Sequence, residues 1–226
     1  MIHAAQPITP LSTLADLATH YAGASRVFHR HGLDFCCHGR ISLEAACAEN
    51  RLDVGALIGE LSAEQARDTD FRAWDSAPLS ELVEHVLERY HADHRAELPR
   101  LVEAAQKVER VHADKASCPR GLAQHLEHMS SELEDHMQKE EHVLFPLIQR
   151  GHGAMASMPI QVLEHEHRDH ALNLQRLRAL AHDFAPPAEA CNTWRALYLG
   201  LAELERDLMQ HIHLENNVLF PRALRS

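Results

Sequence analysis

The chain has 226 residues, of which 45% are apolar, 24% are charged and 5% are aromatic, and its formal net charge is −11. This composition is typical of a globular protein of one or two domains, and the negative charge argues against nucleic acid as the main partner, because phosphate binding needs a basic surface. The sequence contains no run of about 18 apolar residues, so it predicts no membrane-spanning helix. The abundance of Leu, Ala, Glu and His favours helical structure.

The N-terminus and the cysteines indicate the compartment. Residues 1–14 lack the basic region followed by an apolar core that marks a secretory signal. Five cysteines, an odd number in a chain of this length, do not suggest a disulfide framework. We therefore expect the protein to work in the reducing cytoplasm.

Residues 1–66 are predicted to form a small helical domain. The capping residues and apolar periodicity place its helices at 12–20, 24–31 and 42–48 and from Asp53 onward. Gly32 stands where a left-handed residue would close the second of these helices. Residues 67–78 break the periodicity and end in a proline, so they are predicted to be a linker, in which Phe71 and Trp74 are candidates for packing.

Two adjacent cysteines, Cys36 and Cys37, lie between the second and third predicted helices, in the stretch DFCCHGR. One interpretation is a pair of small buried residues. Neighbouring cysteines form a disulfide only with a strained ring, so a structural bridge is not expected. Beside His38, the thiols suit redox exchange or soft-metal binding, and because two thiols cannot complete a tetrahedral site, such a metal would be transient or shared. The remaining cysteines, Cys47, Cys118 and Cys191, are interpreted as packing residues.

The region 79–226 is predicted to form the main domain. Its apolar periodicity and its prolines place four long helices at 79–112, 119–149, 159–182 and from beyond Pro187 to 224. Pro99 should kink the first helix near Arg95, and Pro146 and Pro221 should bend or end their helices. Long helices joined by short loops predict an all-α fold, an antiparallel four-helix bundle preceded by the small helical domain.

An internal repeat organises this region. The pattern H-x-x-x-E-x-x-x-L-F-P occurs at 136–146 and again at 211–221, and the pattern H-x-D-H occurs at 91–94 and 167–170. The first histidines of the two patterns are 45 residues apart in one copy and 44 in the other. A fixed order at a fixed spacing indicates a duplicated helical hairpin. Its apolar faces bury imidazole and carboxylate groups, which need a partner there.

A metal centre is the partner that suits both side-chain types. The repeat supplies His136, Glu140, His211 and Glu215, together with one histidine from each H-x-D-H motif. Periodicity alone does not choose between the first and second histidines of those motifs. Four histidines and two glutamates exceed the four ligands of a structural zinc and suit two ions, both bridged by the two glutamates. Imidazole with carboxylate favours iron or manganese, and we expect iron.

Single histidines on an apolar helix face are more often core residues than ligands, so the assignment of these histidines as metal ligands rests on the repeat. Histidines without a repeated counterpart are interpreted as neighbours of the site or as solvated residues; these are His125, His128, His142, His165 and His213.

The whole chain resembles the bacterial di-iron proteins of the repair of iron centres, or iron-sulfur cluster repair, family, and its second domain resembles the hemerythrin-like bundle. The resemblance rests on LDFCC at 33–37, RYHADHR at 89–95, VERVHADK at 108–115, HMQKEEHVLFP at 136–146 and HIHLENNVLFPRAL at 211–224. It implies the ligand set His91, His136, Glu140, His167, His211 and Glu215. His94, His170 and Glu166 then become neighbours of the metals. His38 departs from the family, which often has glycine there.

The resemblance implies a cytoplasmic di-iron protein, induced by nitrosative or oxidative stress, that helps to restore damaged iron-sulfur clusters in other proteins. Two irons per chain, oxo- or hydroxo-bridged, would either be donated to apo-clusters or bind and reduce nitric oxide. Cys36 and Cys37 would be redox or iron-transfer thiols. Oxygen-carrying hemerythrins use a fifth histidine, and a centre with four would lose iron, or bind nitric oxide or dioxygen, more easily. Enzymatic activity and a homodimer are both left open by the sequence.

Three alternatives come from other classes. A hemerythrin-like oxygen or nitric oxide carrier or sensor without repair activity would leave the cysteine-bearing domain unexplained. A di-iron oxidase would more typically show Glu-x-x-His pairs. A zinc-stabilised structural bundle would bind metal without colour or redox activity.

Overall fold

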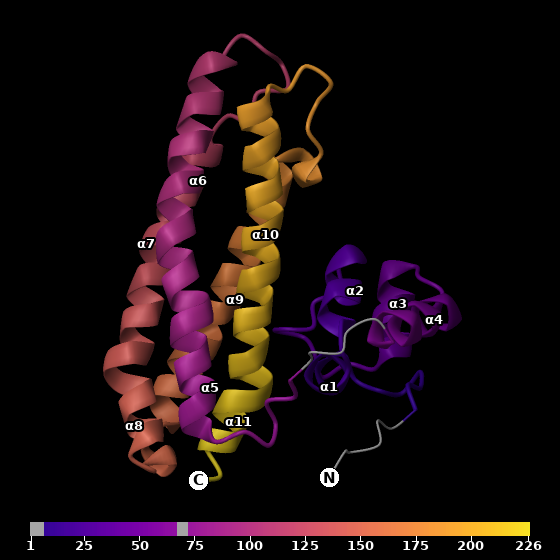
Figure 1. Ribbon diagram of the computed structural model, residues 1–226, viewed down its shortest axis with the longest axis vertical. Coiled ribbons are helices and arrows are strands. Elements are labelled where there is room, and N and C mark those ends of the chain that lie inside the picture. Colours follow the sequence, from indigo (N-terminus) through magenta and orange to yellow (C-terminus); the bar gives the residue numbers. More distant parts are fainter. Residues whose placement is uncertain (1–6, 67–71) are drawn as a thin grey trace.

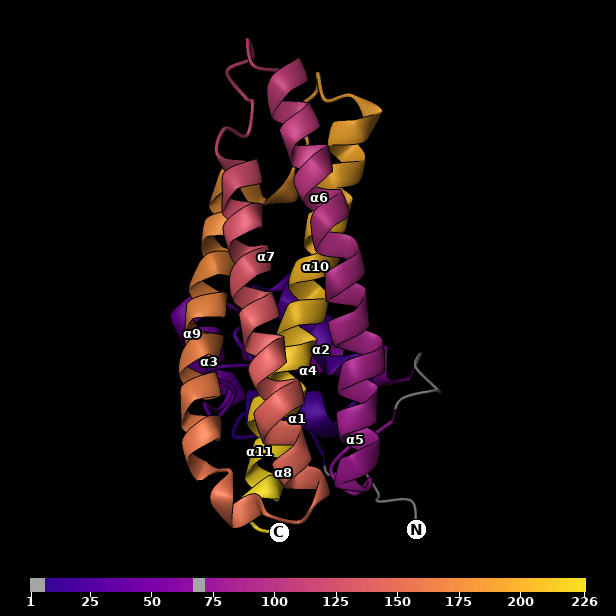
Figure 2. The same cartoon turned by 90° about the vertical axis from the view of Figure 1, so that its left-hand side faces the viewer.

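The computed structural model describes residues 7–66 and 72–226, and within them every regular element is helical. Four long helical rods form an antiparallel bundle, and a smaller helical unit packs against one side of it (Figure 1). A quarter turn places the small unit behind the bundle (Figure 2). The predicted all-α class is confirmed. No helix of the described residues is long and apolar enough to cross a membrane.

The small unit contains α1 (Leu14–His20), α2 (Ala24–Arg30), α3 (Leu43–Asn50) and α4 (Val54–Gln65). Ser42 and Asp53 cap α3 and α4 as predicted, because their side chains accept backbone N–H groups of the first turn. The cap of α1 is Thr13 rather than Ser12, since the Thr13 hydroxyl accepts the Asp16 N–H. Gly32 has φ +65°, the left-handed conformation expected of it.

The first rod of the bundle consists of α5 (Leu79–His85), η1 (Val86–His91) and α6 (Ala92–Val111), and the second of α7 (Leu122–Lys139), η2 (Glu140–Leu144) and α8 (Phe145–Gln149). The third follows the short η3 (Gly153–Met155) as α9 (Ser157–Leu180) and is closed by η4 (His182–Phe184). The fourth consists of α10 (Asn192–Leu214), η5 (Glu215–Leu219) and α11 (Phe220–Ala223). The second rod therefore begins three residues later than predicted, after Gly121, whose φ is +85°.

Three short stretches, η1, η2 and η5, are π-helical, and nothing in the sequence analysis anticipated them. The Phe145 N–H donates to the Glu140 carbonyl, and the Phe220 N–H donates to the Glu215 carbonyl, five residues back in each case. A proline follows each phenylalanine and has no N–H for the normal helical bond. The helices continue beyond Pro146 and Pro221, so these prolines accompany a widened turn. α6 likewise continues through Pro99.

The small unit docks on the fourth rod. Helices α1 and α2 both contact α10, and the His29 Nε2 lies 2.8 Å from a carboxylate oxygen of buried Glu205 in α10. Trp74 stacks on His85 at a ring-centroid distance of 4.3 Å, and the Arg222 guanidinium donates to the Trp74 carbonyl. This part of the predicted linker is therefore packed on the bundle. Phe71 lies outside the described residues, and the division of the chain at 67–78 stays a prediction.

Candidate metal centre

The six side chains predicted as ligands meet inside the bundle. Each of the four rods contributes at least one of them: His91 ends η1, His136 lies in α7, Glu140 begins η2, His167 lies in α9, His211 lies in α10 and Glu215 begins η5. None is more than 1% exposed. The two glutamates therefore stand at the first residue of a π-helical stretch, where the wider turn changes the direction of the side chains relative to the rest of the helix.

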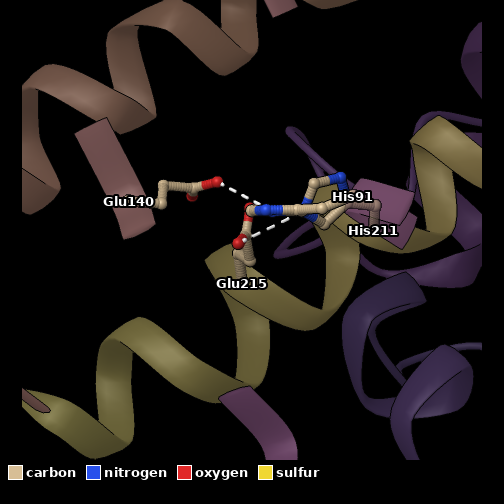
Figure 3. A group of neighbouring side chains, drawn as sticks. All are labelled: His91, Glu140, His211 and Glu215. Atoms are coloured by element: carbon tan, nitrogen blue, oxygen red, sulfur yellow. Dashed lines mark ion pairs between the residues drawn. The ribbon is translucent and has the colours of Figure 1, made fainter. Parts of the chain in front are cut away.

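The six residues form two overlapping groups of four. One contains His91 and His211, the other contains His136 and His167, and Glu140 and Glu215 belong to both. Within each group the potential ligand atoms all lie within 4.8 Å of one another. Figure 3 shows the first group, with the imidazoles of His91 and His211 directed at the carboxylates.

Each glutamate divides its two oxygens between the groups. The Glu140 Oε2 lies 3.2 Å from the His91 Nε2, and its Oε1 lies 3.5 Å from the His136 Nε2. The Glu215 Oε1 lies 3.3 Å from the His211 Nε2, and its Oε2 lies 3.2 Å from the His167 Nε2. A carboxylate with one oxygen toward each group has the arrangement that bridging two cations requires.

Unpaired polar atoms test whether a metal fits these residues. Both carboxylate oxygens of Glu140 and of Glu215 are buried without a hydrogen-bond partner, and so are the Nε2 atoms of His91 and His211. The His91 and His211 nitrogens lie within ion-pair distance of carboxylate oxygens, yet no hydrogen bond joins them. Buried polar atoms are almost always satisfied in native proteins. The donor set therefore fits cations held between the rods.

The outer nitrogens of three candidate ligands are held by polar neighbours. The His91 Nδ1 lies 2.8 Å from a Glu141 oxygen, and the His136 Nδ1 lies 2.9 Å from a Glu166 oxygen. Hydrogen bonds of this kind fix the imidazole so that its Nε2 faces the metal, and they raise its basicity as a ligand.

Asn216 supplies the third such contact, 2.7 Å from the His167 Nδ1. The Nδ1 of His211 has no partner, and the ring is instead stacked on Tyr90 at 5.3 Å. Sequence reasoning recognised Glu166 but missed Glu141 and Asn216. Both directly follow a repeated glutamate, and that shared position was the available signal.

Burial changes the pKa values of these groups and so affects how they would bind a cation. It lowers the pKa of His91 and that of His136 to about 4, so both rings are neutral near pH 7. Burial and the neighbouring Glu215 carboxylate raise the pKa of Glu140 well above its usual value. Burial alone would raise the pKa of Glu215 too, but His211 and His167 hold it below its usual range. Without a metal, the Glu140 carboxyl group therefore keeps its proton to a higher pH than the Glu215 carboxyl group does.

Among the other histidines, two are buried beside the centre. His94 and His170 belong to neither group of potential ligands, and the assignment of His91 and His167 as ligands stays a prediction. His125 is buried farther along α7 and its Nε2 is satisfied by the Asn173 carbonyl at 2.9 Å. His213 is buried between the small unit and α10, where its Nε2 lies 3.3 Å from the Thr19 hydroxyl. His128, His142 and His165 are exposed.

The two adjacent cysteines lie beside one of the candidate ligands, His167. The Cys37 thiol is 3.6 Å from the carbonyl oxygen of the candidate ligand His167. Asn216, whose side-chain oxygen contacts the His167 ring, also donates from its Nδ2 to the Cys36 carbonyl at 3.1 Å. The thiol segment and one candidate ligand thus contact the same side chain, Asn216.

Asp34 completes the thiol group, and the sequence analysis did not single it out. Its Oδ1 accepts the Cys36 thiol at 3.2 Å and the Cys37 N–H at 2.9 Å, while its Oδ2 lies 2.6 Å from the exposed His38 ring. The hydrogen bond to Cys37, together with burial, raises the pKa of the Cys36 thiol well above its usual range. All five cysteines are free thiols.

Two families match the chain. Residues 82–223 match the family described as the hemerythrin HHE cation binding domain. Residues 11–65 match the ScdA_N family, which is described as a domain of unknown function. The first match contains all six candidate ligands, and the second contains the two adjacent cysteines.

Curated relatives match along most of the chain. The iron-sulfur cluster repair protein YtfE of Edwardsiella ictaluri is 49% identical over 211 residues, which cover 93% of this chain and 96% of the relative. The protein of the same name from Yersinia pseudotuberculosis is 50% identical over 213 residues, covering 94% and 96%. The one from Musicola paradisiaca is 46% identical with the same coverage.

Proposed function

The chain belongs to the iron-sulfur cluster repair proteins with a hemerythrin HHE cation binding domain, and from this membership we propose that it holds two irons and helps to restore damaged iron-sulfur clusters. The observation that carries the proposal is the pair of buried groups that share Glu140 and Glu215. One structural zinc would need only four ligands, whereas six converging side chains in two overlapping groups suit a pair of cations.

Each iron would have its own pair of histidines. His91 and His211 would hold one and His136 and His167 the other, with the two glutamates bridging. Imidazole and carboxylate ligands favour iron or manganese, and the family membership favours iron. When bound, the irons supply one-electron redox chemistry and sites for a small ligand such as nitric oxide or dioxygen.

The protein residues around the centre orient the ligands and exclude water. Glu141, Glu166 and Asn216 hold three imidazoles through their outer nitrogens. Phe145 stacks on His91, and Phe220 stacks on His167, each at a ring-centroid distance of 5.7 Å. The two phenylalanine rings pack apolar surface against the imidazoles.

Iron donation is the account that the thiols support best. Cys36 and Cys37 lie beside His167, and with Asp34 they form a second, smaller group of potential metal ligands. Two thiols and a carboxylate next to a ligand could receive iron that leaves the centre, with loss of a thiol proton on binding, and pass it to a protein with a damaged cluster. The five free thiols support action in a reducing compartment, which we propose to be the cytoplasm.

Reduction of nitric oxide is the second candidate. Joining two nitric oxide molecules to give nitrous oxide and water consumes two electrons and two protons. Oxidation of two thiols to a disulfide releases the same numbers, and the Cys36 and Cys37 sulfurs are 3.8 Å apart. Because adjacent cysteines form only a strained disulfide, that bridge would be easily reduced again by cellular thiols.

The two accounts differ in how firmly iron is held. Ferrous iron binds oxygen ligands less tightly than ferric iron because its charge is lower. If iron is donated, a chelator should remove it faster from the reduced protein than from the oxidised protein, as followed by the absorbance of the chelate. Equal release rates would contradict the donation account and favour nitric oxide chemistry.

A further inference from the structure

Two buried histidines beside the metal centre have no assigned role. His94 is 2% exposed and His170 is 4% exposed, and the Nε2 of each lacks a hydrogen-bond partner. Among the described residues, the only other buried histidine nitrogens without a hydrogen-bond partner belong to His91 and His211. A bound metal would satisfy the Nε2 atoms of these two residues. Native proteins rarely leave buried polar groups unsatisfied, so His94 and His170 require a partner of another kind.

The two histidines flank the two groups of candidate ligands symmetrically. His94 follows His91 by three residues, and its ring lies 5.4 Å from the His211 ring, in the first group. His170 follows His167 by three residues, and its ring lies 4.9 Å from the His136 ring, in the second group. Each H-x-D-H motif thus supplies one candidate ligand and, one helical turn later, one unpaired imidazole.

Direct metal ligation is not what these positions favour. The ligand atoms of each group lie within 4.8 Å of one another, and neither His94 nor His170 satisfies that condition with them. Both rings nevertheless contact ligand rings. A group at that position is well placed to reach something bound to the metal.

We propose that His94 and His170 donate Nε2–H hydrogen bonds to a small ligand with a lone-pair acceptor, such as a diatomic molecule or a small anion, held at the two-metal centre. The proposal rests on the proposed function, because it needs the irons to hold the ligand. One donor would serve each iron. The rings would then set the affinity of the centre for small molecules without changing how it holds metal.

Azide binding to the oxidised protein tests the proposal. Phenylalanine keeps the size of the ring and removes its nitrogens, so His94→Phe and His170→Phe should each keep the iron content of the unaltered protein. Each should weaken azide binding about tenfold, the effect of losing one hydrogen bond to a charged group. His94→Gln and His170→Gln keep an N–H near the same place and should recover much of the affinity. His125→Phe, a change at a buried histidine bonded elsewhere, should leave the affinity unchanged.

Iron content separates the possible failures. Unchanged azide affinity in both phenylalanine variants, with iron intact, would overturn the proposal and leave the two histidines as packing residues. Loss of iron in these variants, but not in His125→Phe, would also overturn it, because the residues would then be ligands. If the unaltered protein does not bind two irons, the proposed function fails first, and this proposal falls with it.

A second measurement needs no variant. The azide stretching frequency of the loaded, unaltered protein should shift between H2O and D2O if N–H groups donate to the ligand. The glutamine variants keep an N–H near the ligand and should also show a shift, which is smaller where the amide N–H is less well aligned with the azide. The shift should persist in His125→Phe. Absence of any shift in the unaltered protein would contradict the proposal even if the phenylalanine variants do not fold.

Discussion

At the scale of single residues, the two glutamates matter most, because each belongs to both groups of potential ligands. The repeated H-x-x-x-E pattern was enough to predict them, together with His136 and His211. Choosing His91 over His94 and His167 over His170 needed the family resemblance, since both members of each pair are buried. Glu141 and Asn216 were missed although both directly follow a repeated glutamate, because an acid or an amide at such a position is also common on solvated helix faces.

Replacing a bridging glutamate should cost more iron than replacing one histidine. Glu140→Leu or Glu215→Leu removes a ligand from both groups and leaves the positive charge of two cations less compensated, so iron should fall below one per chain. His91→Ala alters one group and should leave about one iron, while His125→Ala should have no effect. Metal analysis of the purified variants provides the measurement. Equal losses in Glu140→Leu and His91→Ala would show that the glutamates do not bridge.

Metal uptake should release protons at pH values just above the usual titration range of a glutamate. The raised pKa of Glu140 means that its carboxyl group keeps a proton above its usual range, and a cation must displace that proton. The lowered pKa values of His91 and His136, about 4, mean that these rings are already neutral and begin to compete for protons only as the pH falls towards 4. We expect at least one proton per chain to appear in a pH-indicator assay during anaerobic ferrous loading. Uptake without proton release would contradict the pKa assigned to Glu140.

At the scale of elements, the number and order of the bundle helices followed from apolar periodicity and the repeat. The π-helical stretches could not be predicted in this way. One extra residue in a turn leaves the spacing of the apolar residues nearly unchanged on either side and only rotates the apolar face beyond the insertion. Pro146 and Pro221 gave a signal, but proline predicts a bend as readily as a widened turn. The contact between the small unit and the bundle depends on His29 and Glu205, 176 residues apart, a separation that no local pattern spans.

That contact should control access to the thiols. His29→Ala removes the hydrogen bond to Glu205, which remains paired with Arg178 at 2.7 Å. We expect a loss of about 1–2 kcal/mol in the free energy of unfolding, together with faster alkylation of half-buried Cys37, measured by mass spectrometry. His31→Ala is the matched control, because its partner Glu60 belongs to the small unit itself. An unchanged alkylation rate in His29→Ala would show that other contacts hold the unit in place.

At the scale of the whole molecule, the small unit and the bundle meet where the thiols approach the metal centre. Asn216 contacts both His167 and the backbone of Cys36, so the two parts form one site. The sequence predicted a linker between the two parts and gave no position for the thiols, whereas the structure holds them beside the candidate ligand His167. Sequence patterns could not show this, because docking is decided by shape and buried polar contacts.

The thiols should serve function and not iron retention. Cys36→Ser combined with Cys37→Ser should keep the iron content and the absorption spectrum, while cluster repair or nitric oxide turnover falls. Cys191→Ser, at an exposed cysteine, is the control and should change neither. Full activity in both assays would make the pair packing residues, and complete loss of iron would make them ligands of the centre.

The central claim is that two buried groups sharing Glu140 and Glu215 hold a pair of irons. Its most direct test is the iron content of protein purified aerobically from iron-replete cells, combined with a Mössbauer spectrum of the same protein enriched in iron-57. The account predicts about two irons per chain in a spin-coupled diferric pair. One iron per chain, zinc in place of iron, or two irons without magnetic coupling would contradict it.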